Sequence, residues 1–226
     1  REILSISHKE WYVGYPCGHR RLPRSRRPPE YLDAYNFHTD LRIKTKAHMK
    51  TDFIVIGSGI AGLNFSLKAA EFGNVLVITK KTIRQSNTNY AQGGIAAVLD
   101  QSDTLDSHYE DTLKAGGYHN NKRAVKFMVK RGPALVLELS AQGVPFQQTG
   151  EALSLTLEGG HSTSRIAYVG DKTGQAIEQS LVQRVRRHPQ ITFQENAMAI
   201  DLIVRGNRCY GVQYMKENKI HNVFAK

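Results

Sequence analysis

The sequence predicts an α/β fold, with a central parallel sheet followed by an additional antiparallel β layer that is incomplete at the C-terminus. Two short apolar runs, at 53–56 and 75–78, are typical of parallel strands buried on both faces. Between them, residues 60–72 carry apolar side chains at helical spacing. After about residue 190 the pattern changes to short strands separated by turn residues.

The elements are expected in a regular order. Residues 52–79 should form a strand, a Gly-rich turn, a helix and a second strand, joined by a right-handed βαβ connection. Three more helices are expected, at about 104–115, 121–142 and 173–187. Pro133 predicts a bend or a restart in the second of them, because proline breaks the helical hydrogen-bond ladder. Four strands separated by the turn signals Gly206-Asn207 and Glu217-Asn218 should follow, near 191–195, 198–204, 208–215 and 220–224.

Residues 1–48 differ in composition from the rest of the chain. They contain 10 Lys/Arg, 5 Asp/Glu and the pair Pro28-Pro29, with no helical or alternating apolar period. We therefore expect a disordered or non-native leader over 1–48 and a partial domain over 49–226. Met49 is the expected natural initiator. A targeting peptide, which the arginines favour and the acidic residues oppose, and an ordinary internal methionine remain alternatives.

The net charge of +11 suggests a nucleic-acid partner. The expected leader carries +5 of that charge, however, and the remaining +6 is spread over 178 residues, as on an ordinary solvated surface. We expect no nucleic-acid partner. Cys17 and Cys209 match no paired metal spacing, and no apolar stretch approaches the length of a membrane helix. The composition thus favours a cytoplasmic protein without a structural metal or a membrane anchor.

A glycine-rich turn lies between the first strand and the first helix. It reads Gly57-Ser58-Gly59-Ile60-Ala61-Gly62 and has the G-x-G-x-x-G spacing in the context that a dinucleotide site requires. The first glycine permits the tight turn, the second lets the backbone approach a pyrophosphate, and the third lets helix and strand pack closely. Backbone N–H groups at the helix start then face the phosphates. The fold is therefore predicted to be Rossmann-like.

The residues after the second strand leave the type of dinucleotide open. FAD and NAD sites usually place an acidic residue there to bind the ribose, whereas this chain has Thr79-Lys80-Lys81. The lysines suit an NADP-type site with a 2′-phosphate, a flavin site that binds the ribose by other contacts, or a solvated loop.

A second motif follows in the loop Ser86–Val98. Together with the turn, it strongly resembles the succinate dehydrogenase, fumarate reductase and L-aspartate oxidase superfamily of flavoproteins, over residues 51–223. The resemblance implies FAD as cofactor and makes Thr79-Lys80 an expected feature. It also implies that the loop runs along the flavin and approaches the isoalloxazine ring with its backbone. The residues concerned are Asn87, Thr88, Asn89, Tyr90, Ala91, Gln92, Gly93 and Gly94.

Two further positions follow from the resemblance. Membrane-bound relatives have, at the place of Asn87, the histidine that is covalently attached to FAD. A carboxamide cannot form that bond, so the FAD is expected to be non-covalent. Met198 and Ala199 are expected to touch the adenine end through backbone atoms.

The segment Glu158-Gly159-Gly160-His161-Ser162 resembles L-aspartate oxidases in particular, because relatives that act on succinate or fumarate tend to have an uncharged residue before Gly-Gly. Glu158 could pair with the α-ammonium of aspartate through a charge-assisted hydrogen bond. Its carboxylate would be desolvated and unpaired against a substrate without the amine. Glu158, with His161 beside it, is therefore the predicted substrate-orienting group. His108 and His119 share no ligand-like arrangement with His161 and are interpreted as surface or packing residues. Asp106, Glu110 and Asp111 suggest paired carboxylates but fit the solvated face of a helix equally well, so they are given no chemical role.

The resemblance implies FAD-dependent oxidation of L-aspartate. Hydride would pass from the α-carbon to N5 of FAD and give iminoaspartate, and oxygen or fumarate would reoxidise the flavin. The product would enter quinolinate and NAD biosynthesis, and coupling to quinolinate synthase is expected. The proton-transferring arginine of the family lies in a capping domain, expected beyond Lys226, so no arginine of this chain is given a catalytic role.

Three alternatives remain. The chain could belong to a soluble fumarate reductase or succinate dehydrogenase-type flavoprotein, which differs in substrate. It could be a catalytically incomplete nucleotide-binding fragment. A basic nucleic-acid module is the third reading, and it predicts salt-sensitive binding that depends on residues 1–48.

Overall fold

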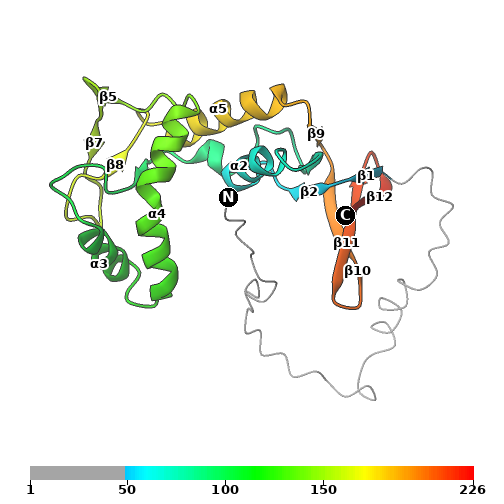
Figure 1. The fold of residues 1–226 in the computed structure, drawn as a ribbon, viewed down its shortest axis with the longest axis horizontal. Helices are drawn as coiled ribbons and strands as arrows, with labels where there is room; N and C mark the ends of the chain where they lie inside the picture. The colour runs from blue at the N-terminus through cyan, green and yellow to red at the C-terminus, as the bar shows by residue number, and fades with distance from the viewer. Residues whose placement is uncertain (1–48) are drawn as a thin grey trace, which may run out of the picture. The chain divides into compact units, whose positions relative to one another are not determined.

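The computed structural model describes residues 49–226 (Figure 1). The expected leader over 1–48 lies outside the described residues. Backbone contacts group Ala47–Lys226 into one compact unit. Within it, the predicted α/β fold with a parallel sheet and an antiparallel layer is confirmed.

The parallel sheet has the strand order β2-β3-β9. Strands β2 (Phe53–Ile56) and β3 (Val75–Ile78) are joined through helix α2 (Ile60–Ala69), as the βαβ pattern predicts. Strand β9 (Ile191–Gln194) was expected beside the later antiparallel strands. It lies instead in the parallel sheet, with Val75 opposite Ile191, because a buried central strand such as β3 needs a hydrogen-bonding neighbour on both sides.

The side chains of β3 alternate between two hydrophobic cores. Val75 and Val77 pack in the core formed with α2 and helix α5 (Thr173–Arg187). Leu76 and Ile78 pack on the other side, against Val212 and further residues of the antiparallel layer. All four residues of β3 are buried, which explains the continuous apolar run in the sequence.

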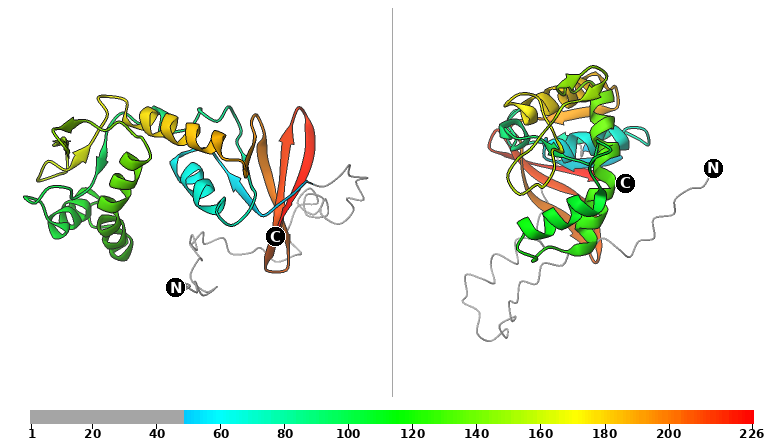
Figure 2. Two further views of the ribbon diagram at one scale, coloured as in Figure 1. Left: turned by 45° about the horizontal axis from the view of Figure 1, so that its top comes forward. Right: turned by 90° about the vertical axis from the view of Figure 1, so that its left-hand side faces the viewer.

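The antiparallel layer has the strand order β1-β12-β11-β10. Three of its strands correspond to predicted ones: β10 (Met198–Arg205), β11 (Arg208–Lys216) and β12 (Lys219–Ala225). Both predicted turns are present, with positive φ at Gly206, Glu217 and Asn218. Strand β1 (Met49–Thr51) was not predicted and pairs in parallel with β12. Figure 2 shows these strands as a layer beside the parallel sheet.

Helices α3 (Leu105–Ala115) and α4 (Lys122–Ala141) begin at side-chain caps. The Thr104 hydroxyl accepts from the Ser107 N–H at 3.1 Å, and the Asn121 carboxamide accepts from the Ala124 N–H at 3.1 Å. The predicted restart at Pro133 is wrong, because α4 is a single helix across it. On either side of the proline, buried Val129 packs with Leu113 of α3, and buried Val136 packs in the core formed with α2 and α5.

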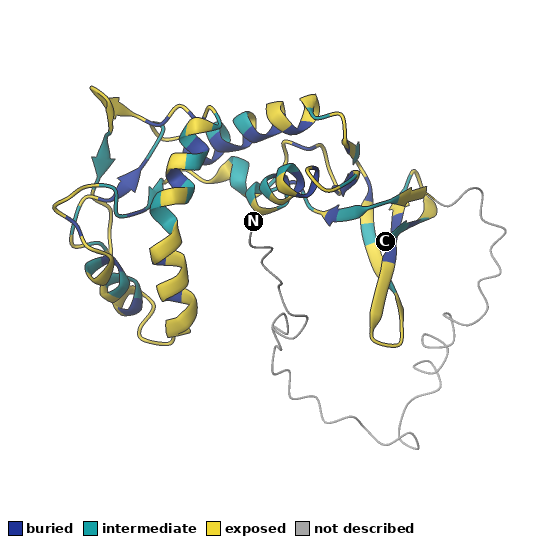
Figure 3. Ribbon diagram, in the orientation of Figure 1, coloured by how far each residue is buried: buried dark blue, intermediate teal, exposed yellow. Residues whose placement is uncertain are grey.

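Short strands connect the helices to the loops of the site. Strands β4 (Ile95–Ala96), β8 (Ile166–Ala167) and β7 (Leu155–Thr156) form a small sheet in the order β4-β8-β7, and β5 (Gln148–Thr149) pairs with β6 (Ala152–Leu153). None was predicted, since two residues carry too little pattern. Figure 3 shows the inner face of α5 buried and the tip of the β10–β11 hairpin exposed.

Candidate functional site

The glycine turn has the geometry that its sequence predicts. Strand β2 ends at Ile56, and Gly57 follows with φ of +105°, a conformation that residues with a side chain rarely adopt. A Cβ atom on Gly62 would overlap the carbonyl oxygen of Gly57, so helix and turn pack this closely only with glycine. Helix α2 then starts with Gly59 as an N-cap that lacks a side-chain hydrogen bond. Its first N–H groups can therefore bind an anion.

The turn is tied to the end of β3. The hydroxyls of Ser58 and Thr79, both buried, are 3.0 Å apart. Ala61 and Lys80 are exposed beside them. The Ala197 N–H donates to the Thr79 carbonyl at 2.9 Å, and the Asn196 N–H donates to the Lys81 carbonyl at 3.2 Å. These bonds place the start of β10, with exposed Met198 and half-buried Ala199, next to Lys80. The residues predicted to bind the adenosine half of a dinucleotide thus lie together.

The second predicted loop meets the turn directly. Its Thr88–Tyr90 segment forms a short 3₁₀ helix, η2, with Asn87 as its N-cap. The Thr88 hydroxyl accepts from the Ile60 N–H at 3.1 Å, in the first turn of α2. Asn87, Tyr90 and Gln92 are exposed, and Asn89 is half-buried. The glycine turn and the loop, predicted from separate motifs, therefore form one continuous surface.

Helix α5 supports the loop from behind. The Gly174 N–H donates to the Ala91 carbonyl at 3.0 Å. Fully buried Glu178 accepts a hydrogen bond from the Ser86 hydroxyl, whose oxygen accepts in turn from the Asn89 N–H at 3.3 Å. Burial raises the pKa of Glu178, although the hydrogen bond from Ser86 acts in the opposite direction. Glu178 was not predicted, because a single acidic residue in an amphipathic helix is normally solvent-exposed.

The loop ends against the predicted substrate residue. Gly94 lies directly before β4, which pairs with β8. A Cβ atom on Gly93 would be 3.5 Å from the Glu158 Oε2 atom. The carboxylate predicted to orient the substrate therefore faces the backbone predicted to approach the flavin ring. Glu158, Gly159 and Gly160 are exposed, so a ligand can reach them.

A buried arginine, also missed, lies behind Glu158–Ser162. Arg165 donates to both carboxylate oxygens of Asp103 at 2.8 Å and to Asp111 Oδ2 at 2.7 Å. It also donates to the Ser107 hydroxyl at 3.0 Å. Ser107 and Asp111 are four residues apart in α3, and Asp103 directly precedes its N-cap Thr104; this four-residue spacing is the sequence signal that could have placed the three side chains together.

Two histidines border this arginine. The His161 Nδ1 atom is 3.4 Å from the Arg165 Nη1 atom, and the His108 and His161 ring centroids are 5.8 Å apart. His108 and His161 thus lie close together at Arg165. The interpretation of Asp111 as part of a solvated helix face is wrong, because Arg165 and Ser162 donate to its carboxylate. Burial lowers the pKa of His108, and the positive charge of Arg165 lowers it further. Burial raises the pKa of Asp111, but hydrogen bonds from Ser162 and Arg165 outweigh this and lower it to about 2.

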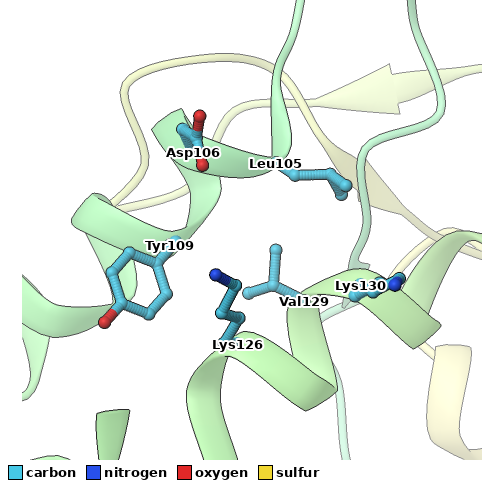
Figure 4. A pocket seen from close by; sticks show the side chains of 6 residues that line it. All are labelled: Leu105, Asp106, Tyr109, Lys126, Val129 and Lys130. Carbon is cyan, nitrogen blue, oxygen red and sulfur yellow. The ribbon is translucent and has the colours of Figure 1, made fainter. Parts of the chain in front are cut away.

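A pocket of about 210 Å³ lies between α3 and α4, away from these motifs (Figure 4). None of the predicted site residues lines it; the lining residues are Leu105, Asp106, Tyr109, Lys126, Val129 and Lys130. Over residues 49–226, no group of three or more His, Cys, Asp or Glu side chains could hold a metal ion. In the same range, no helix has the length and apolar character needed to cross a membrane.

Known proteins show the same combination of sequence and fold. An L-aspartate oxidase of Ralstonia nicotianae is 42% identical over 78% of this chain and 35% of its own length. A chloroplastic L-aspartate oxidase of Oryza sativa is 43% identical over 71% of this chain and 26% of its own length. An E. coli quinol fumarate reductase superposes with a TM-score of 0.76 at 25% identity, covering 80% of this chain and 32% of that one. The chain spans between a quarter and two fifths of the L-aspartate oxidases it matches.

The residues present suit a flavin dinucleotide. The tight turn at Gly57 and the start of α2, where the N-cap Gly59 has no side chain, suit a pyrophosphate, and the loop up to Gly93 leaves open backbone beside Glu158. The FAD binding domain family matches residues 52–226, nearly all of the described part. The chain therefore belongs to the FAD binding domain family, and FAD is its cofactor.

Proposed function

We propose that the protein is an FAD-dependent oxidoreductase that oxidises L-aspartate to iminoaspartate. The observation that carries this proposal is the position of Glu158. Its carboxylate lies against Gly93 of the loop expected to face the flavin ring, and the relatives with 42–43% identity are L-aspartate oxidases.

The residues divide the binding of FAD between them. The pyrophosphate is held by the turn Gly57–Gly62 and the start of α2. The adenosine is held by Lys80 and the backbone of Met198-Ala199, and the flavin ring by Asn87–Gly94. Bound FAD supplies the acceptor for the hydride that leaves the α-carbon of the substrate. The Asn87 side chain cannot form the covalent bond that a histidine could, so the cofactor is held by non-covalent contacts.

The protein side chains orient the substrate. Glu158 accepts a charge-assisted hydrogen bond from the α-ammonium of L-aspartate, and His161, four residues from Arg165, binds a substrate carboxylate. Against succinate, the Glu158 carboxylate would be left without a partner in the closed site, which lowers affinity. Arg165 takes no part in proton transfer, because its side chain is completely buried and its guanidinium group is bound to the carboxylates of Asp103 and Asp111.

The remaining parts of the reaction rest on the likeness to L-aspartate oxidases. Oxygen or fumarate accepts the electrons, and iminoaspartate supplies quinolinate and NAD biosynthesis, with coupling to quinolinate synthase. The protein works in the cytoplasm in this proposal.

Replacement of Glu158 tests the proposal in the complete enzyme. Glu158→Gln keeps the size of the side chain but removes the charge, so kcat/KM for L-aspartate should fall at least about tenfold, as expected when a charge-assisted hydrogen bond is lost. Fumarate reduction should change much less, because fumarate carries no ammonium group. The matched control is Glu151→Gln, at another exposed loop residue. An equal loss of both activities would contradict the proposal.

A soluble fumarate reductase or succinate dehydrogenase-type flavoprotein is the second candidate. It is favoured by the likeness to the E. coli quinol fumarate reductase and to a Mycobacterium smegmatis Sdh1 complex, which has 28% identity and a TM-score of 0.75. The two candidates differ in how the oxidised flavin responds to substrate. L-aspartate should bleach its absorbance if our proposal holds, whereas bleaching by succinate alone would favour the second candidate. A purified chain without flavin absorbance would indicate a catalytically incomplete fragment.

A further inference from the structure

Arg165 has an unusual environment for an arginine. Its side chain has no solvent exposure, and the side chain of its bidentate partner Asp103 is only 1% exposed. Asp111, the second partner, is 17% exposed. Two carboxylates therefore surround one buried guanidinium, an arrangement that is stable only if every donor and acceptor is satisfied. The planar fork of arginine meets this condition because it binds both oxygens of Asp103 at once.

The same cluster continues into the substrate loop. Asp111 Oδ2 accepts from the Ser162 N–H at 2.8 Å and from the Ser162 hydroxyl at 2.7 Å. The Ser107 hydroxyl lies 3.2 Å from that of Ser162. The loop is thus anchored to α3 at Ser162, four residues after Glu158.

His161 receives a further constraint from Arg165. A guanidinium group only donates hydrogen bonds, so the His161 Nδ1 atom, 3.4 Å from Arg165 Nη1, must be the acceptor. The ring proton is then on Nε2. The backbone N–H of His161 also donates to the Glu158 carbonyl at 3.3 Å, which closes the turn between the two residues.

We propose that Arg165 is a positioning residue for the substrate, which acts by holding the Glu158–Ser162 turn against α3 and by presenting His161 with its proton on Nε2. That Nε2–H is then a donor for a substrate carboxylate, while Glu158 receives the ammonium. This proposal rests on the function proposed above. It adds that the recognition of a dicarboxylate depends on a charged cluster buried below the site.

The test is Arg165→Lys in the complete enzyme. Lysine keeps the positive charge but cannot bind Asp103 and His161 together, because it is a point charge without a fork. KM for L-aspartate should rise at least tenfold, with a smaller change in kcat and an unchanged dissociation constant for FAD. His161→Gln should raise KM in the parent enzyme but add little in the Arg165→Lys background, since the two residues act as a unit.

A control separates positioning from general destabilisation. Val212→Ala removes a buried side chain in the core below the antiparallel layer, far in sequence from the loop. If Val212→Ala raises KM as much as Arg165→Lys at the same loss of Tm, Arg165 is only structural and the proposal is wrong. Additive effects of Arg165→Lys and His161→Gln would also overturn it.

Two further variants cover the other outcomes. If Arg165→Lys does not fold, Asp111→Asn is tested in its place. The same rise in KM is expected, because Ser162 and Arg165 lose a charged partner. An unchanged KM overturns the proposal. Glu158→Gln distinguishes the two levels of inference. In one outcome, Glu158→Gln loses L-aspartate oxidation selectively while Asp111→Asn and Arg165→Lys keep a normal KM. That result would overturn the role of Arg165 and leave the proposed function intact.

Discussion

At the scale of single residues, the site contains two buried or half-buried carboxyl groups whose pKa values move in opposite directions. Asp111 accepts from Arg165 and Ser162, which stabilise its ionised form and lower its pKa to about 2. Glu178 accepts from a neutral donor, the Ser86 hydroxyl, so burial dominates and raises its pKa. The two groups therefore link stability to pH with opposite signs.

Asp111→Asn should destabilise the protein at neutral pH. A carboxyl with a lowered pKa in the folded state stabilises the fold above its unfolded pKa, and a shift from 3.8 to about 2 corresponds to about 2 kcal/mol. The difference between parent and variant should stay constant above pH 5 and shrink as the pH falls from about 4 toward 2. Urea unfolding as a function of pH measures it. Asp106→Asn, at an exposed position of the same helix, is the control and should show no such dependence.

Glu178→Gln should behave in the opposite way. Its folded pKa is raised, so ionisation costs stability as the pH rises through the unfolded pKa, and the cost is complete above the folded pKa. Glutamine keeps an acceptor for Ser86 but cannot ionise. The variant should therefore gain stability relative to the parent between acidic and neutral pH. A difference that does not change with pH would show that Glu178 has the same pKa in the folded and the unfolded protein, and would contradict the raised pKa.

At the scale of elements, the site depends on close approach between backbones. The turn after β2, helix α2 and the η2 loop meet within hydrogen-bonding distance at Ile60 and Thr88. A Cβ atom on Gly59 would already be 3.3 Å from the Thr88 hydroxyl. Helix propensity is secondary here, because the space between the elements decides which residues fit.

Gly62→Ala tests this point. Alanine is favoured over glycine inside a helix by about 1 kcal/mol, so propensity alone predicts a more stable α2. The new methyl group would instead overlap the Gly57 carbonyl and push the turn away from the position that binds pyrophosphate. FAD affinity should fall at least about tenfold, as expected for the loss of about 1.4 kcal/mol. Titration of the apoprotein with FAD measures it, and Lys68→Ala, exposed on the same helix, should leave the affinity unchanged.

At the scale of the whole molecule, the contacts of the candidate site lie within Ala47–Lys226. Much of the positive charge lies outside this unit, in residues 1–48. Nearly half of the net positive charge, +5 of +11, is therefore carried by residues that the candidate site as described does not use.

Deletion of residues 1–48 should consequently leave FAD binding intact. The flavin absorbance per mole of protein and the dissociation constant for FAD should match those of the full chain, because the described contacts of the site join residues within 49–226. Any weak, salt-sensitive binding to DNA should decrease with the lost charge. A colourless deletion variant would show that the first 48 residues contribute to the flavin site.

The sequence by itself determined the βαβ unit and the glycine turn. Both are local, because each is read from a run of adjacent residues whose spacing follows the period of a helix, a strand or a turn. The role of Glu158, which was singled out by the resemblance, stays a prediction. The likeness to known flavoproteins then connected the separate motifs to one cofactor.

Only the tertiary structure decided the contacts between distant segments. Arg165 meets Asp103 across 62 positions, and Glu178 meets Ser86 across 92. Strand β9 joins the parallel sheet beside β3, and β1 pairs with the distant strand β12. A buried charge or an unpaired strand edge must find its partner wherever the fold brings one near, and this partner leaves no periodic signal in the sequence around it.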